Sequence, residues 1–165
     1  MGTKGNEIID LDIDELIKKL NSALADEWLA YYQYWVGAKV VEGAMSGEAI
    51  TELTEHADEE LNHANLLADR IVQLGGTPVL NPAKWQEMNT CDYKEPNDPA
   101  VLAILDQNIE AEQCAIVTYQ DLLNFTKDKD VVTYFIILEI LKDEVEHEDD
   151  LQQLKIDIEK IRNQN

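Results

Sequence analysis

The stretch Glu60-Leu61-Asn62-His63 is the strongest pointer to the fold, because a carboxylate and an imidazole three residues apart lie on the same face of a helix. The same spacing returns at Glu144-Val145-Glu146-His147, so two of the three histidines of the chain complete such a pair. A Glu-x-x-His pair on each of two helices is typical of bundles that bind metal in their core. The sequence therefore predicts a metal site built between helices.

The sequence has four long amphipathic segments, and two of them include the Glu-x-x-His pairs. Apolar residues recur at helical spacing over about 12–42, 47–74, 99–127 and 130–161. Asp12, followed by Glu15 three residues later, indicates a helix start, and Asp98-Pro99 indicates another. Gly75-Gly76 indicates a helix end. No segment shows the alternating pattern of a strand, so we predict four long helices.

The segment between the second and third helices, residues 75–98, lacks this periodicity and is rich in proline. It is too long for a tight turn between antiparallel neighbours, so we expect a crossover that runs the length of the molecule. A short helix at about 82–88 is expected within it, with Pro82 at its first position. The sequence thus predicts an all-α four-helix bundle, made of two hairpins joined by one long crossover.

Length and charge restrict the possible functions. The 165 residues suit one domain, residues 1–165, and 34 acidic against 13 basic residues give a net charge of −21. This charge repels phosphate backbones and argues against direct DNA binding. Two cysteines are compatible with a reducing compartment. With no apolar run near the ~18 residues of a membrane span and no secretion signal in residues 1–12, we expect a cytoplasmic protein without membrane contact.

Glutamates interrupt the apolar faces of three predicted helices. Glu27, Glu60 and Glu144 each stand where the pattern calls for an apolar side chain. A buried carboxylate is costly unless it takes a proton or finds a cation, and facing carboxylates also repel one another. A metal ion would resolve both problems.

In the third predicted helix, about 99–127, two glutamates are candidates for the metal site. One apolar stripe selects Glu112 and another selects Glu110, and periodicity alone does not choose between them. The first stripe contains Leu105, Ile109, Ile116 and Leu123, and the second contains Ala103, Gln107, Cys114 and Val117.

The expected ligand set has the composition of a two-metal site. One Glu from each of two helices and a Glu-x-x-His pair from each of the others give four carboxylates, whose charge two divalent ions balance. Such oxygen-rich ligation suits iron or manganese, with zinc as a competitor. Two ferrous ions can each give one electron, which matches the two-electron reduction of peroxide to water.

These residues resemble the bacterioferritin-type di-iron ferroxidase motif of ferritin-like proteins, and the resemblance covers all four helices. The matching positions are Glu27, Glu60, His63, Glu110, Glu144 and His147. Within the family the chain looks most like the Dps-like thioferritins, which have a cysteine four residues after the glutamate of the third helix. Glu110 and Cys114 have that spacing. The resemblance therefore selects Glu110 over Glu112 and implies that Cys91 and Cys114 form a redox-active pair or disulfide near the iron site.

The resemblance also implies ligand roles and an assembly. Glu27 and His63 would be terminal ligands of one iron, Glu110 and His147 of the other, and Glu60 and Glu144 would bridge. Leu61 stands where haem-binding relatives have methionine, so haem is not expected; manganese or zinc can substitute for iron. The lack of a fifth helix implies a homo-oligomer of twelve subunits, and the lack of a basic tail argues against Dps-style DNA binding.

The leading functional hypothesis is iron storage with protection against oxidative stress, in which a ferroxidase oxidises Fe(II) with hydrogen peroxide or O2. An alternative is a di-manganese catalase or another di-metal oxidase without storage. A third reading is a non-catalytic helical interaction module. His56 is expected to be a solvated histidine among acidic neighbours and is left out of the ligand set.

Overall fold

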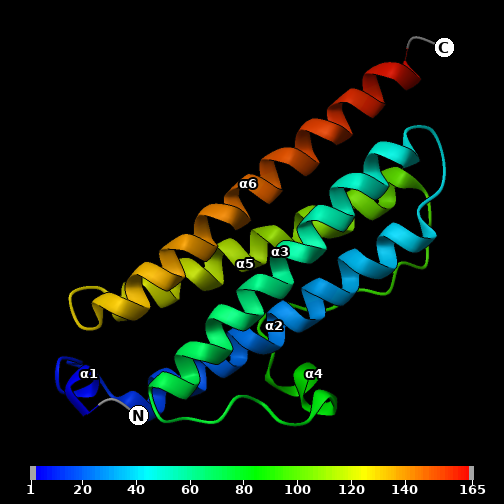
Figure 1. Cartoon of the computed structure of the whole chain (residues 1–165). Helices are drawn as coiled ribbons and strands as arrows, with labels where there is room; N and C mark the ends of the chain where they lie inside the picture. Colours follow the sequence, from blue (N-terminus) through cyan, green and yellow to red (C-terminus); the bar gives the residue numbers. More distant parts are fainter. Residues whose placement is uncertain (1–2, 164–165) are drawn as a thin grey trace.

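Two antiparallel helical hairpins form the body of the protein in the computed structural model, which describes residues 3–163 (Figure 1). The first pairs α2 (Ile13–Val40) with α3 (Ser46–Gln73), and the second pairs α5 (Val101–Thr126) with α6 (Val131–Arg162). The described residues form no strand, and none of their helices is long and apolar enough to cross a membrane. The predicted all-α four-helix bundle of the ferritin-like kind is confirmed.

The helix ends follow local chemistry. The Asp12 side chain caps α2 by accepting a hydrogen bond from the backbone N–H of Glu15, at 3.1 Å, as predicted. At the end of α3, the N–H of Gly76 donates to the carbonyl of Ile71, while Gly75 has a φ of 88°, a conformation that favours glycine. Gly75-Gly76 therefore ends the helix as expected.

The start of α5 differs from the prediction that Asp98 caps it and Pro99 is its first residue. The helix begins two residues after Pro99, at Val101. The backbone of Glu42, just after α2, donates to the carbonyl of Pro99 (2.7 Å) and accepts from the N–H of Val101 (3.0 Å). This pairing holds Pro99 and Ala100 out of the helix, so the prediction was wrong because a contact distant in sequence overrides the local signal.

The long crossover connects the end of α3 to the start of α5 at the opposite end of the bundle (Figure 1). It contains η1 (Pro82–Lys84) and α4 (Trp85–Met88), which confirms the short helix expected at about 82–88. Trp85 stacks on Trp28 of α2, with ring centroids 5.4 Å apart and planes 4° apart. A further short helix, α1 (Thr3–Glu7), precedes α2 and has no counterpart in the prediction.

Polar side chains of α2 hold the crossover against the bundle. Asn21 donates to the carbonyl of Thr77 (3.2 Å), and Gln33 accepts from the backbone N–H of Lys94 (3.0 Å). Asp26 lies between them on α2 and binds the middle of the crossover. The crossover therefore has a fixed path along α2 although most of it is not helical.

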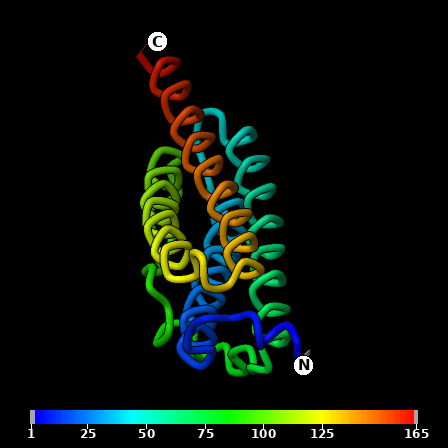
Figure 2. The backbone as a smooth tube through the Cα atoms, turned by 90° about the vertical axis from the view of Figure 1, so that its left-hand side faces the viewer, coloured from blue at the N-terminus to red at the C-terminus, as the bar shows by residue number. Residues whose placement is uncertain are grey.

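The apolar core consists of two clusters at different levels of the bundle. The first includes Leu16, Leu20, Leu67, Ile71, Leu123 and Ile137, and the second includes Leu53, Ala57, Val101, Leu105, Leu151 and Ile158. Buried glutamates and histidines lie between these two sets of positions along α2, α3, α5 and α6. Beyond the second cluster, the last turns of α6 extend past the loop that joins α2 and α3 (Figure 2).

A buried ion pair connects the two hairpins at the start of α6. Asp130 caps this helix by accepting from the N–H of Thr133 (3.2 Å), and its other oxygen accepts from Nη2 of Arg70 (2.8 Å) on α3. Burial disfavours the charged carboxylate, yet hydrogen bonds from Thr133 and Arg70 outweigh it and hold the pKa of Asp130 below its usual range. The pair thus stabilises the docking of α3 against α6.

We expect Asp130→Asn to lower the free energy of unfolding at pH 7 by about 3 kcal/mol, because it leaves the buried Arg70 without its counter-charge. A carboxylate whose folded pKa is depressed stabilises the fold fully above about pH 4 and loses this effect as the pH falls through the folded pKa. The gap between variant and wild type should therefore narrow in urea titrations taken from pH 7 towards pH 3. Asp128→Asn, in the same turn but exposed, is the control. A gap independent of pH would contradict the assignment.

Candidate metal centre

Six acidic and imidazole side chains converge between the two core clusters. They come from all four long helices, and each is at most 2% exposed. The set consists of Glu27 from α2, Glu60 and His63 from α3, Glu112 from α5, and Glu144 and His147 from α6. They occupy inward helix positions at which the rest of the stripe is apolar, so the helices that build the core also position the polar side chains.

These six residues form two overlapping groups. In one, Glu27, Glu60, His63 and Glu144 offer ligand atoms that lie within 4.8 Å of one another; in the other, Glu60, Glu112, Glu144 and His147 do the same. Glu60 and Glu144 belong to both groups. Each group thus has one glutamate and one histidine of its own in addition to the two shared carboxylates, and each could hold a metal ion.

Five carboxylate oxygens of this cluster have no hydrogen-bond partner. Each of the four glutamates has at least one buried oxygen without one, and Glu144 has two. Among residues 3–163, these four carboxylates form ion pairs with His63 and His147 and none with a lysine or arginine. Because buried carboxylates require a proton, a donor or a cation, the residues present fit a pair of metal ions.

The prediction that Glu110 completes the set was wrong. Its side chain is 60% exposed and pairs with Lys94 of the crossover, whereas Glu112 is 2% exposed and lies in the cluster. Of the two stripes on this helix, the one with Leu105 and Ile109 faces the core. The thioferritin-like spacing to Cys114 therefore pointed to the wrong side of α5, and the apolar stripe was the better signal.

Two buried tyrosines brace the terminal glutamates across the bundle. Tyr34 of α2 donates its hydroxyl hydrogen to Glu112 of α5, and Tyr119 of α5 donates to Glu27 of α2. Sequence reasoning did not assign either role. The sequence does contain a signal for these roles. Each tyrosine follows the glutamate of its own helix by seven residues, which is two helical turns.

Two further carboxylates orient the histidines, again across the bundle. Nε2 of His63 lies 3.1 Å from Oδ2 of Asp143 on α6, and Nε2 of His147 lies 2.7 Å from Oε2 of Glu59 on α3. The Nδ1 atoms therefore face the cluster, as expected of imidazoles held by a carboxylate behind them. The sequence missed these residues too, although an acidic residue directly precedes both Glu60 and Glu144.

The pKa values of these side chains are shifted by burial and by the negative charge of the cluster. Burial, followed by the charges of Glu60 and Glu144, raises the pKa of both Glu27 and Glu112. Burial opposes charge on His147, but contacts with Glu144 and Glu60 outweigh it and raise the pKa of His147 to about 12. A metal ion that binds here would therefore have to displace protons, so its binding would depend on pH.

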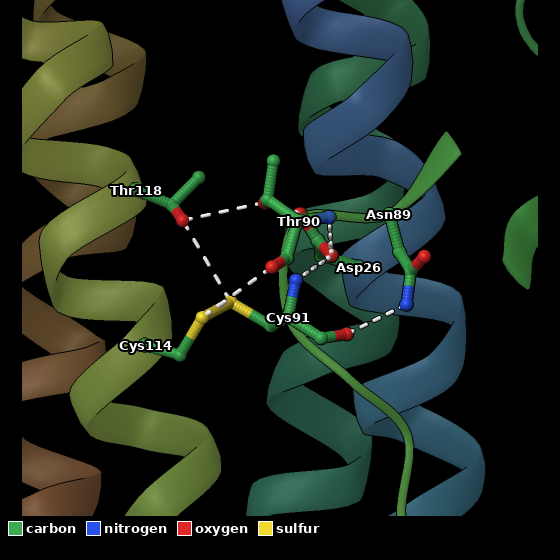
Figure 3. The surroundings of a disulfide bond; sticks show 6 residues. All are labelled: Asp26, Asn89, Thr90, Cys91, Cys114 and Thr118. Carbon is green, nitrogen blue, oxygen red and sulfur yellow. Dashed lines mark hydrogen bonds between the residues drawn. A yellow bond between two sulfur atoms is a disulfide. The ribbon is translucent and has the colours of Figure 1, made fainter. Parts of the chain in front are cut away.

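A disulfide bond joins the crossover to α5 beside this cluster. Cys91 and Cys114 are bonded, with their Cα atoms 5.8 Å apart, so the predicted pair does meet (Figure 3). Cys91 also lines a narrow pocket of about 30 Å³, together with Glu27, Glu60, Glu112 and Glu144. The disulfide thus lies beside a pocket that reaches the four clustered carboxylates.

Asp26 fixes the position of Cys91. One carboxylate oxygen accepts from the backbone N–H groups of Thr90 (2.8 Å) and Cys91 (2.9 Å), and the other accepts from the Thr90 hydroxyl (Figure 3). Asp26 is 8% exposed, and burial raises its pKa although these hydrogen bonds oppose the rise. This carboxylate, adjacent to Glu27, therefore couples the disulfide segment to the metal-centre helix α2.

The expectation of a solvated His56 was wrong. Its side chain is 2% exposed and its ring stacks on that of His147, with centroids 4.0 Å apart and planes 21° apart. Burial, and then the charge of His147, lowers the pKa of His56 to about 3. His56 is thus a neutral imidazole packed beside the metal centre.

A family model of the ferritin-like domain matches residues 17–161. The chain belongs to the ferritin-like family. A DNA protection during starvation protein of Pyrococcus furiosus is 36% identical over 140 residues, which cover 84% of this chain and 75% of that protein. A bacterioferritin of Desulfovibrio desulfuricans is 28% identical over 134 residues, covering 81% and 70%.

Among solved structures, this ferritin-like chain is similar to one described as a dodecameric thioferritin, the bacterioferritin-related protein of Bacteroides fragilis. The TM-score is 0.96 and the identity is 48%, with 99% of this chain and 98% of that chain covered. The predicted resemblance to Dps-like thioferritins is therefore confirmed.

Glu112→Gln should remove one divalent ion per subunit of this ferritin-like protein, because it takes the charged terminal ligand from the second group. Glu110→Gln makes the same change on an exposed side chain of the same helix and should leave metal binding as in the wild type. Titration calorimetry with Zn²⁺ measures the number of ions bound. If Glu110→Gln lost an ion and Glu112→Gln kept it, the assignment of the α5 ligand would be reversed.

Asp26→Ala should make the disulfide easier to reduce, because Cys91 is then held less firmly within reach of Cys114. A tenfold loss of effective thiol concentration corresponds to about 30 mV. Equilibration in glutathione redox buffers, followed by thiol alkylation, measures the midpoint. Asp92→Ala, an exposed position in the same segment, is the control, and equal midpoints for both variants would show that Asp26 has no such effect.

Proposed function

We propose that this protein is a ferroxidase that stores iron and protects against oxidative stress. It binds two ferrous ions as substrate, oxidises them with hydrogen peroxide or O2, and deposits ferric mineral inside a hollow homo-oligomer. One observation carries the proposal: two four-residue ligand groups share Glu60 and Glu144 in a buried site that contains no counter-charge from lysine or arginine among the described residues.

Each residue of the centre has a distinct task in this proposal. Glu27 and His63 are terminal ligands of one iron, Glu112 and His147 are terminal ligands of the other, and the two shared glutamates bridge. Four carboxylates balance two divalent ions, so the loaded site is close to neutral. Carboxylates with few nitrogen ligands favour iron or manganese, with zinc as a competitor, and nothing in the proposal requires haem.

The surroundings of the ligands control charge and access. Two ferrous ions give two electrons, and hydrogen peroxide with two protons accepts them to become two water molecules. Tyr34 and Tyr119 hold the terminal glutamates while the iron charge rises, since their hydroxyl groups donate to Glu112 and Glu27. The pocket beside Cys91, which the same glutamates line, is the route by which a small oxidant would reach the iron.

The assembly we propose has twelve subunits. The similar thioferritin of Bacteroides fragilis is described as dodecameric, and it matches this chain over nearly its whole length. The chain also exposes apolar side chains around the turn between α5 and α6, where Ile8, Val131 and Phe135 are each more than half exposed. Contacts between subunits would bury such a surface.

The protection that we propose is chemical. The net charge of −21 opposes direct binding to DNA phosphates, so the protein acts by removing ferrous iron and peroxide, which together produce damaging radicals. The Cys91–Cys114 pair belongs to the same proposal as a redox pair. Its reduction by a thiol reductant breaks the S–S bond and keeps two electrons beside the iron centre.

Loss of both shared carboxylates tests the function. Glu60→Ala combined with Glu144→Ala should slow ferrous oxidation by about 100-fold or more, since even outer partners of metal ligands contribute 10–100-fold. Absorbance of the ferric product measures the rate under peroxide and under O2. Glu48→Ala combined with Glu139→Ala removes two exposed glutamates from the same helices and is the matched control.

Two outcomes would contradict the proposal. Oxidation by wild type no faster than by the Glu60/Glu144 double variant would exclude a ferroxidase, and wild type that binds no transition metal would favour a helical interaction module. Size-exclusion chromatography with iron analysis tests storage separately. A monomer or dimer that decomposes peroxide with manganese and retains no iron would favour the catalase alternative.

A further inference from the structure

A second pocket adjoins the disulfide, between α2, α5 and the crossover. This α2–α5 groove has a volume of about 350 Å³, and its lining includes Glu15, Lys18, Lys19, Thr90, Thr118 and Asp121. None of its lining residues belongs to the pocket that reaches the four clustered carboxylates. The groove is therefore a separate site, and its volume suits a small molecule.

The disulfide lies next to the α2–α5 groove. Oγ1 of Thr118 lies 3.7 Å from Sγ of Cys91, and Thr90 directly precedes Cys91 in the chain. Both threonines line the groove, and Figure 3 shows them beside the two sulfur atoms. Cys91 and Cys114 are only partly buried. A molecule bound in the groove therefore lies within reach of the S–S bond.

Two lysines give the groove an unusual charge for this protein. Among residues 3–163, neither Lys18 nor Lys19 forms an ion pair, and Nζ of Lys19 lies 5.1 Å from the centre of the Phe125 ring on α5. The chain as a whole has a net charge of −21, and none of its described lysines lines either pocket beside the metal centre. Two ammonium groups without counter-charges attract carboxylates.

The remaining charges of the groove narrow the class of ligand. Glu15 and Asp121 also line it, so it can bind an amino group as well as carboxylates. Lys19 precedes Asp26, whose carboxylate holds Cys91, by seven residues. This is about 10 Å along the axis of α2. A peptide of two or three residues spans that distance when extended, at about 3.5 Å per residue.

We propose that the α2–α5 groove binds a small zwitterionic peptide thiol, which reduces the Cys91–Cys114 bond. Its carboxylates pair with Lys18 and Lys19, and its sulfur lies against the disulfide. This inference deepens the redox role proposed above for the cysteine pair and rests on it.

The exchange balances with two peptide thiols. The first, as a thiolate, attacks Sγ of Cys114; an S–S bond to the peptide forms, and Cys91 leaves as a thiolate that accepts a hydrogen bond from the Thr118 hydroxyl. The second thiolate attacks the peptide sulfur of this mixed disulfide and releases the thiolate of Cys114. The protons of the two peptide thiols pass to the two cysteines. Two electrons have then moved to the cysteine pair, and the peptide leaves as its disulfide.

Reduction of the oxidised full-length protein by glutathione tests the groove, with alkylation and mass spectrometry to count free thiols. The rate should saturate as glutathione rises. Lys18→Gln combined with Lys19→Gln should lower the initial slope of rate against concentration about fivefold, as expected for two exposed ion pairs. The uncharged thiol 2-mercaptoethanol should reduce both proteins equally fast. Lys39→Gln combined with Lys142→Gln removes two exposed lysines outside the groove and is the matched control.

A second measurement uses S-methylglutathione, which cannot exchange with the disulfide. Titration calorimetry should show one molecule bound per subunit of the wild type and of the Lys39/Lys142 variant, and none bound to the Lys18/Lys19 variant. Circular dichroism verifies that each variant is folded.

Three results would overturn the proposal. They are a rate strictly proportional to glutathione concentration, equal slopes for the two double variants, and saturable reduction by a protein dithiol such as thioredoxin alone, which would assign the groove to a protein partner. No iron enters these measurements. Failure of the ferroxidase assay would therefore leave them unchanged, and ferrous oxidation by a protein that fails them would refute only the peptide-thiol site.

Discussion

Four carboxylates buried within a few ångströms of one another impose the central constraint on this structure. Each has an inner oxygen without a hydrogen-bond partner, and burial, followed by mutual repulsion, raises the pKa of Glu27 and Glu112. A bundle of this length could have filled the same positions with leucine. Instead the apolar core is divided into two clusters, and buried glutamates and histidines fill the space between them.

The supporting contacts are arranged as two matching halves. A tyrosine of α2 supports the glutamate of α5, and a tyrosine of α5 supports the glutamate of α2. In the same way, a carboxylate of α3 orients the histidine of α6, and a carboxylate of α6 orients the histidine of α3. Four of the six clustered side chains are therefore held by a residue of another helix. Such cross-bracing fixes ligand orientation with few residues, because one helix pair serves as the scaffold of the other.

Much of this arrangement is predictable from sequence because it depends on helical periodicity. The four long helices and the convergence of Glu60, His63, Glu144 and His147 follow from apolar spacing and from two repeated pairs. The choice of Glu110 failed because a spacing taken from relatives was given more weight than the stripe through Leu105 and Ile109. The start of α5 and the burial of His56 failed for another reason: both depend on contacts with distant segments, namely Glu42 and His147.

The sharing of Glu60 and Glu144 links metal to the order of assembly. Each hairpin is closed by a short loop and can form from contacts that are local in sequence. Neither hairpin contains a complete ligand group, since each group takes at least one carboxylate from the other hairpin. The binding energy of a cation is therefore available only after the hairpins have docked. A metal ion bound by these groups would therefore stabilise the docked bundle and would not stabilise either hairpin alone.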